Sequence, residues 1–220
     1  MERDERTFLM GEEVGYYDGA YKVSRARYMS AGALSCPIVF RGPGGAVQQL
    51  GAQHSNSFEG MYANCPGLKV MMPATSKDAK GMLKTAIRDD NPVVFIESEA
   101  MYGVKGEVPV PTCIKAAEVL KSEGINAEVL DLRSIRPLDE EAIFRSVRKT
   151  NKAIVVHEAS PVASIGAWLA SYVTEQMFDY LDAPVRVISA KDFPFPYSKS
   201  LEKGMCPEPE DIIRFVKQVA

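Results

Sequence analysis

The sequence has few of the features that mark membrane, nucleic-acid-binding or disulfide-stabilised proteins. No apolar run approaches the roughly 20 residues that cross a bilayer, so we expect no membrane partner. The 26 basic side chains are outnumbered by 29 acidic ones, giving a net charge of -3, which does not favour binding of nucleic acid. The cysteines, Cys36, Cys65, Cys113 and Cys206, form no C-x-x-C pair. This spacing predicts neither a zinc site nor a disulfide framework and is typical of a reducing compartment.

Composition and apolar patterning predict a soluble α/β protein. With 220 residues, 46% hydrophobic and 25% charged, the chain can form one large or two small domains. Regular alternation of elements predicts mostly parallel sheets covered by helices. The expected strands are 7–10, 37–40, 68–72, 93–96, 125–132, 153–156 and 185–189. The expected helices are 76–91, 115–122, 139–149, 165–180 and 210–219, with Ser76 as the N-cap of the first and a linker at 103–112.

One histidine stands out by its position. The apolar run 37–40 ends in the glycine-rich stretch 41–45, and Gln53, His54 and Ser55 follow before the next strand at 68–72. A loop that presents His54 beyond a strand end is suited to acid/base chemistry, because imidazole titrates near neutral pH. The alternative is a hydrogen-bonded packing residue, and the sequence leaves both readings open.

Two further stretches contain candidate polar sites. Glu12 and Glu13 follow the strand expected at 7–10, and they form either a polar site or a solvated turn. The helix end at 86–91, stopped by Pro92, leaves carbonyl oxygens without helical partners, and these attract hard cations. An ordinary solvated helix end is the alternative there.

Longer motifs then point to a family. They are FLMGEEV (8–14), GAYKVS (19–24), PIVFRGP (37–43), AQHS (52–55), CPGLKV (65–70), AIRDDNPVV (86–94), DLRSIRPLD (131–139) and FDYLDAP (178–184). In this order they resemble the beta subunits of the thiamine-diphosphate-dependent pyruvate dehydrogenase component. The resemblance implies a transketolase-like pyrimidine-binding domain at 1–108, followed by a transketolase C-terminal domain at 112–220, both incomplete.

The resemblance also implies the cofactors and residue roles. His54 would be the catalytic histidine, and Glu12 would lie near the thiamine diphosphate. Potassium would be held at Ile38, Ala86, Ile87, Asp89 and Asn91, and magnesium by the alpha subunit. His157 follows a strand where the family usually has acids, and we interpret it as structural.

The implied function is oxidative decarboxylation of pyruvate with transfer of the acetyl group to lipoyl, active only with an alpha subunit. Further implied partners are a second beta subunit and the dihydrolipoyl acyltransferase core with its lipoyl domain. A branched-chain 2-oxo acid or acetoin dehydrogenase beta subunit is the alternative. The expected location is the cytoplasm in a bacterium or the mitochondrial matrix in a eukaryote.

The chain also departs from the family pattern. Between Arg25 and Ala26 the family carries several dozen more residues, including a glutamate that contacts the aminopyrimidine of the cofactor and an aromatic residue that packs against it. A second shortfall lies between Pro111 and Thr112. The sequence therefore represents either joined parts of a longer protein or a reduced paralogue. Such a paralogue would be a non-catalytic docking module that has lost cofactor binding.

Overall fold

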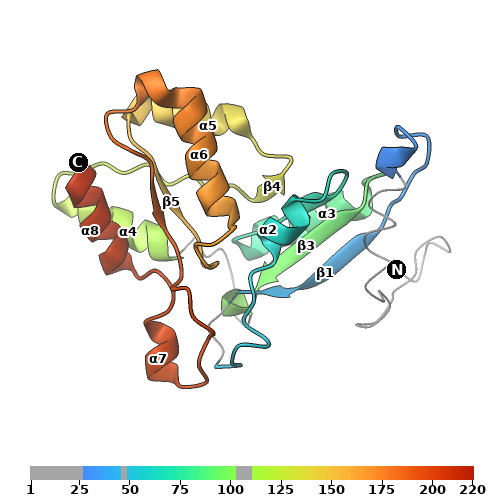
Figure 1. Cartoon of the computed structure of the whole chain (residues 1–220), viewed down its shortest axis with the longest axis horizontal. Coiled ribbons are helices and arrows are strands. Elements are labelled where there is room, and N and C mark those ends of the chain that lie inside the picture. Colours follow the sequence, from blue (N-terminus) through green and yellow to red (C-terminus); the bar gives the residue numbers. More distant parts are fainter. Residues whose placement is uncertain (1–26, 46–48, 103–110) are drawn as a thin grey trace.

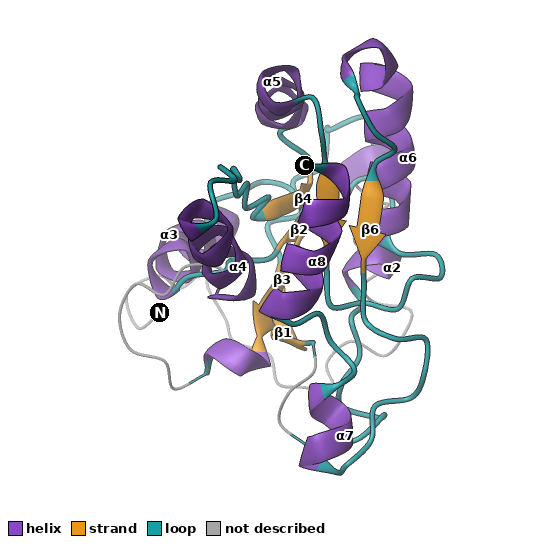
Figure 2. Cartoon of the chain, turned by 90° about the vertical axis from the view of Figure 1, so that its left-hand side faces the viewer, coloured by secondary structure: helices purple, strands orange, loops and turns teal. Residues whose placement is uncertain are grey.

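A computed structural model describes residues 27–45, 49–102 and 111–220. Figures 1 and 2 show an N-terminal half, up to Tyr102, and a C-terminal half that begins at Pro111. The first is built on a four-stranded sheet and the second on a two-stranded sheet. Among the described residues, none of the helices combines the length and apolar character needed to cross a membrane.

The larger sheet is mostly parallel, as predicted. Its strands are β1 (Val39–Gly44), β2 (Lys69–Met71), β3 (Val93–Ser98) and β4 (Ser134–Arg136), in the order β1-β3-β2-β4. Strand β3 runs parallel to β1 and β2, whereas β4 pairs antiparallel with β2. The carboxyl ends of β1, β2 and β3 therefore lie at one edge, where active residues gather in open α/β sheets.

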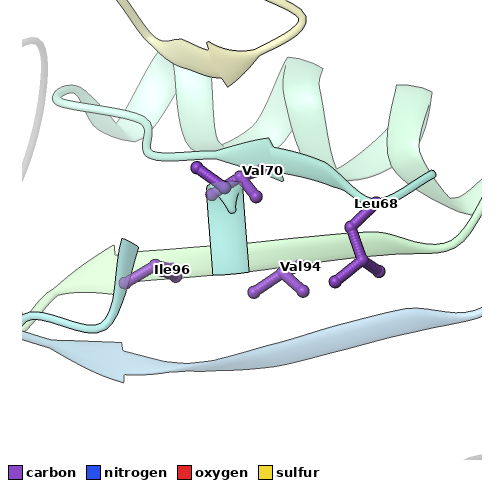
Figure 3. Packing of buried hydrophobic residues seen from close by; sticks show 5 residues of the cluster. Leu68, Val70, Val94 and Ile96 are labelled. Atoms are coloured by element: carbon purple, nitrogen blue, oxygen red, sulfur yellow. The ribbon is translucent and has the colours of Figure 1, made fainter. Parts of the chain in front are cut away.

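Strand β3 is the centre of the N-terminal core. Its apolar residues alternate between the two sheet faces, as the period of a strand requires. Val94 and Ile96 pack with Leu68 and Val70 on one face (Figure 3), which is also contacted by α2 (Glu59–Ala63). Val93 and Phe95 pack on the other face against Ala86 of α3 (Ser76–Ile87).

Helix α3 begins one residue earlier than the sequence suggested. Thr75, not Ser76, is the N-cap: its backbone is extended, and its hydroxyl accepts a hydrogen bond from the Asp78 N–H at 3.0 Å. Ser76 is the first helical residue, so the predicted cap was wrong. The difference is physical, since the cap is decided by which hydroxyl reaches a free N–H of the first turn.

The C-terminal half sandwiches a small parallel sheet between helices. Strands β5 (Ile154–Val156) and β6 (Arg186–Ile188) pair in parallel. Helices α5 (Glu140–Thr150) and α6 (Ile165–Met177) cover one face, and α4 (Pro111–Ser122) and α8 (Pro209–Val219) cover the other (Figure 1). Further elements of the described residues are α7 (Lys199–Lys203) and the 3-10 turns η1 (Glu99–Met101) and η2 (Phe178–Tyr180).

The strand predicted at 125–132 is wrong. No strand forms there, and Val129 and Leu130 are 37% and 41% exposed. The segment instead lines an open cavity with Thr75, Ile114 and Ala142. A strand needs a neighbouring strand to pair its backbone groups, and none of the strands in the described residues pairs with this segment.

Other expectations fall partly outside the described residues. The strand expected at 7–10 and residues 103–110 of the expected linker lie there, whereas Pro111 and Thr112 belong to α4. The helix expected at 165–180 ends at Met177 and continues as η2. Helices α2 and α7 were not predicted, because five residues each are too few for a helical period to stand out.

Strand β4 joins the two halves. It comes from the C-terminal half, yet it pairs with β2, placing Arg136 beside Val70 and Ser134 beside Met71. The Arg136 Nη1 also donates a hydrogen bond to the Ala63 carbonyl at the end of α2, at 2.7 Å. The C-terminal half therefore completes the sheet of the N-terminal half.

Candidate functional site

His54 lies in the loop that follows the carboxyl end of β1. The loop returns to the strand where the Gly45 N–H donates to the Asn56 carbonyl at 3.1 Å. A turn closes from Gly51 to His54, whose N–H donates to the Gly51 carbonyl at 3.4 Å. Ser55, the next residue, is buried. The backbone is therefore anchored on both sides of the histidine.

The His54 side chain is exposed. It lies near the sheet edge where the parallel strands end, and its ring is accessible to a ligand from outside. An accessible imidazole at such an edge is chemically able to accept, donate or orient a proton. The catalytic role suggested by the sequence for His54 stays a prediction, and an exposed side chain in this loop leaves the ring free to take it.

The C-terminal half contacts this loop through Tyr197. The Gln53 Nε2 donates to the Tyr197 hydroxyl at 2.6 Å, and the hydroxyl lies 2.9 Å from the Gln53 Oε1, to which it donates. The tyrosine ring packs so closely on Gly51 that a Cβ there would lie 2.3 Å from a ring carbon. Gly51 also has a φ of 75°, which glycine tolerates best.

A buried carboxylate makes a second contact across the halves. Glu202 of α7 is buried, and its Oε1 accepts a hydrogen bond from the backbone N–H of Gln49 at 2.9 Å. Bonds from an amide to an ionised carboxylate are among the stronger ones in proteins. Together, Tyr197 and Glu202 contact the loop at residues 49, 51 and 53.

Two more glutamates meet where the halves join. Glu59 is 5% exposed, and its Oε2 has no hydrogen-bond partner within the described part of the chain. Burial raises the pKa of Glu59 above its usual value. Burial, and then the negative charge of Glu59, also raise the pKa of Glu158. Because the Glu158 side chain still reaches solvent, water screens the repulsion between them.

His157 has the surroundings of a packing residue. Its Nδ1 accepts a hydrogen bond from the Ala159 N–H at 3.2 Å, and its Nε2 lies 3.4 Å from the Ser164 hydroxyl. The ring rests on Gly166, where a Cβ would come within 2.2 Å of it. Burial lowers the pKa of His157, which keeps the ring neutral near pH 7. These contacts agree with the structural interpretation.

The residues named for potassium lie at the opposite end of β1. The Val93 N–H donates to the Ile38 carbonyl at 2.9 Å, and the Cys36 N–H donates to the Asp90 carbonyl at 2.9 Å. These bonds bring the start of β1 beside the end of α3. Ala86, Ile87, Asp89 and Asn91 are therefore grouped with Ile38, and the group is separated from His54 by the length of β1.

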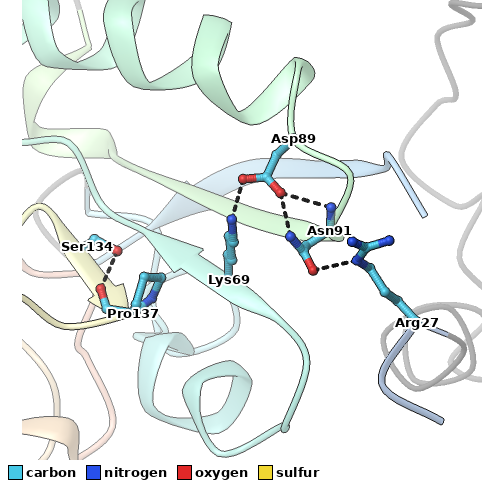
Figure 4. A network of polar contacts seen from close by, with 6 residues as sticks. All are labelled: Arg27, Lys69, Asp89, Asn91, Ser134 and Pro137. Carbon is cyan, nitrogen blue, oxygen red and sulfur yellow. Dashed lines mark hydrogen bonds and ion pairs between the residues drawn. The ribbon is translucent and has the colours of Figure 1, made fainter. Parts of the chain in front are cut away.

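Two cationic side chains already flank this group (Figure 4). Lys69 forms an ion pair with the Asp89 carboxylate, which also accepts hydrogen bonds from the backbone and side chain of Asn91. Arg27 Nε donates to the Asn91 Oδ1 at 2.8 Å. Burial acts to raise the pKa of Asp89, but the bonds from Lys69 and Asn91 outweigh it and lower that pKa.

The donor set fits a main-chain cation site in part. The Ala86 carbonyl accepts a hydrogen bond from Asp89 at 3.2 Å, and the Ile38 carbonyl accepts one from Val93. A carbonyl oxygen has two lone pairs, so each can still face a cation. Asp89 and Asn91, in contrast, use their side chains on Lys69, Arg27 and each other, which leaves their backbone oxygens as the candidate ligands.

One residue predicted from the sequence, Glu12, lies outside the described residues.

Three other residues of the site had no signal in the sequence. The contacts of Tyr197 and Glu202 with the loop span 144 and 153 residues, and no local pattern reports such pairs. Glu59 could have been noticed only as an acidic residue between Phe58 and the apolar positions of a very short helix.

Comparisons with known proteins agree with this architecture. Residues 7–105 match the family model of the transketolase pyrimidine binding domain, and residues 107–212 match that of the transketolase C-terminal domain. A solved structure described as split gene transketolase, inactive beta4 tetramer, has a TM-score of 0.63 and 18% identity and covers 91% of this chain and 73% of its own. At this identity the likeness shows the fold alone.

Sequence relatives are closer. The mitochondrial pyruvate dehydrogenase E1 component subunit beta of Mesocricetus auratus is 52% identical over 201 residues, covering 90% of this chain and 95% of that protein. The corresponding subunit of Rickettsia felis is 36% identical over 305 residues, covering 100% of this chain and 94% of that protein. That alignment is longer than this chain of 220 residues, so the Rickettsia protein carries segments without a counterpart here. The chain therefore belongs to the family of pyruvate dehydrogenase E1 beta subunits.

Proposed function

We propose that this chain acts with an alpha subunit in the oxidative decarboxylation of pyruvate and the transfer of the acetyl group to lipoyl on an acyltransferase core. The single observation that carries the proposal is the exposed His54, anchored beyond the carboxyl end of a parallel strand. Family membership supports the same reading. The proposed assembly contains a second beta subunit and receives the lipoyl domain of the core.

His54 is proposed to hold or move a proton while the acetyl group passes to lipoyl. A ring nitrogen that carries no hydrogen would be the atom that accepts the proton. When bound, thiamine diphosphate would supply the carbon chemistry of decarboxylation, which belongs to the cofactor. The diphosphate and magnesium are proposed to sit on the alpha subunit. Among the described residues, His54 is the group that we assign to face the reaction, and Glu12 stays a proposed neighbour of the cofactor.

The test is acetyl transfer to lipoamide by the co-expressed alpha and beta subunits. His54→Asn is expected to lower the rate about 100-fold, the usual contribution of a positioned acid or base. His157→Asn serves as the matched control, since the chain has two histidines. The rate is measured only on assemblies that unfold at the wild-type temperature, and His157→Asn is expected to have the wild-type rate. Equal rates for the two variants would remove His54 from the reaction.

A second candidate is a docking module without cofactor binding. The absence of the family's cofactor glutamate, which would lie between Arg25 and Ala26, favours it. Calorimetry of thiamine diphosphate binding to the alpha and beta assembly separates the candidates. Binding supports the enzyme, whereas no binding by an assembly that still joins the acyltransferase core supports the module. Assays with pyruvate, branched-chain 2-oxo acids and acetoin then identify the substrate, which the alpha subunit helps to select.

We also propose that potassium binds the backbone oxygens of Ile38, Ala86, Ile87, Asp89 and Asn91. A bound ion stabilises the folded state by mass action, so unfolding should move to a higher temperature in KCl than in LiCl of equal ionic strength. Lys69→Met should enlarge the difference, because the variant removes a built-in cation beside Asp89. Identical unfolding temperatures in the two salts, for both proteins, would exclude the site.

The proposed location follows the relatives. The Mesocricetus auratus relative is named as mitochondrial, while the Rickettsia felis relative is a bacterial protein. We propose the mitochondrial matrix for a eukaryotic source and the cytoplasm for a bacterial one.

A further inference from the structure

We propose that Tyr197 and Glu202 of the C-terminal half are positioning residues. They hold residues 49–54, called the His54 loop below, in the conformation in which His54 acts. The inference deepens the proposed function and rests on it for the role of His54. Neither residue is assigned to contact the substrate. Both act on the backbone and side chains that precede the histidine.

Three contacts at alternate residues fix the loop from one side. Glu202 accepts from the Gln49 N–H, the Tyr197 ring covers Gly51, and the Tyr197 hydroxyl pairs with the Gln53 side chain. The turn that presents His54 starts at Gly51. The start of that turn and the residue before the histidine are therefore both held by the other half of the molecule.

Because Gln53 and Tyr197 are exposed, their effect on the position of His54 can be distinguished from their effect on the stability of the fold. Gln53 and Tyr197 are both exposed, and hydrogen bonds between exposed side chains contribute little to the free energy of folding, because water replaces them. Their geometric effect is larger, since a reacting group displaced by about 1 Å can lose up to about 100-fold in rate. Loss of the Tyr197 hydroxyl should therefore change the behaviour of His54 more than the unfolding temperature.

The first test uses histidine NMR on the isolated chain. With two histidines in the sequence, isotope-labelled histidine gives one set of ring signals each for His54 and His157, and His157→Asn assigns them. Tyr197→Phe removes only the hydroxyl, and Tyr28→Phe is the matched change at another exposed tyrosine. We expect Tyr197→Phe alone to shift and broaden the His54 signals while the His157 signals stay unchanged.

The second test asks whether the acceptor at residue 202 matters. Glu202→Gln keeps an oxygen that can accept from the Gln49 N–H, whereas Glu202→Ala does not. The His54 signals should stay near wild type in Glu202→Gln and change in Glu202→Ala. If Glu202→Ala fails to fold, the comparison of Tyr197→Phe with Tyr28→Phe decides alone. Unaltered His54 signals in Tyr197→Phe would overturn the proposal.

Activity gives an independent readout in the alpha and beta assembly. Tyr197→Phe should lower kcat for acetyl transfer about tenfold with an unchanged KM for pyruvate, and Tyr28→Phe should not. If the wild-type assembly itself transfers no acetyl group, the proposed function fails. The NMR comparison still decides whether Tyr197 and Glu202 hold the His54 loop, so the two failures are distinguishable.

Discussion

Gly51 combines a left-handed backbone with a close aromatic neighbour. Its φ is 75°, and a Cβ would lie 2.3, 2.5 and 2.8 Å from three carbons of the Tyr197 ring. We expect Gly51→Ala to lower the free energy of unfolding by about 1 to 3 kcal/mol through strain and overpacking. Urea unfolding measures the change. Gly81→Ala in α3, where a Cβ meets nothing within 4 Å, should leave stability equal or higher.

Glu59 makes stability depend on pH in a defined direction. Burial raises its folded pKa above the ordinary 4.5, so the folded state holds a proton that the unfolded chain has already released. The contribution of Glu59 to the free energy of unfolding is therefore fully present below its unfolded pKa of about 4.5. It is lost as the pH rises through the higher pKa of the folded state.

Glu59→Gln tests that dependence. The amide cannot ionise, so the variant should lose the decline and be more stable than wild type near pH 7, where the buried Glu59 carboxyl of wild type has lost its proton. Urea unfolding at a series of pH values between 5 and 8 checks it, with Glu210→Gln on the surface of α8 as control. Parallel curves for wild type and Glu59→Gln would contradict the assignment.

The N-cap of α3 can be tested with two adjacent residues. Thr75→Ala removes the acceptor of the Asp78 N–H and is expected to cost about 1 kcal/mol of stability. Ser76→Ala places a strong helix former at the first helical position and should cost less. Thermal or urea unfolding compares them. A larger loss for Ser76→Ala would favour the cap that the sequence alone suggested.

Most helices and strands were predictable because their patterns are local. The apolar residues of β3 follow Pro92, and α5 begins after Asp139, whose side chain accepts from the Ala142 N–H at 3.0 Å. Segment 125–132 has a similar apolar content but no strand beside it. Periodicity reports which residues suit a strand, whereas pairing depends on another part of the chain.

The site was predictable to the same extent. His54, whose role stays a prediction, could be singled out because a glycine-rich loop followed by a histidine is a local pattern. The contacts of Tyr197 and Glu202 with the His54 loop could not be predicted, because they join parts of the chain that only the fold brings together. The same holds for Glu59. Its Oε2 is buried without a hydrogen-bond partner among the described residues, and burial of this kind depends on tertiary packing that a local pattern does not report.

Arg136 links the halves of the molecule and offers a test of their coupling. Its guanidinium satisfies the Ala63 carbonyl at the end of α2, where helical carbonyls lack partners. Arg136→Met keeps an apolar stem but loses this bond, and we expect a loss of about 1 kcal/mol in stability. Calorimetric unfolding measures it. Arg148→Met removes an exposed ion pair with Glu141 at 3.4 Å and a cation–π contact with the Tyr180 ring at 5.9 Å. Both are weak at the surface, so this variant should lose less stability than Arg136→Met.

The antiparallel pairing of β4 with β2 has a consequence for fragments of the chain. After a protease cut between Tyr102 and Pro111, the main-chain hydrogen bonds between β2 and β4 would still hold the two fragments together. The cut protein should therefore elute as a single species in gel filtration. Produced alone, the fragment ending at Tyr102 would expose β2 as an unpaired edge strand, and we expect this fragment to self-associate.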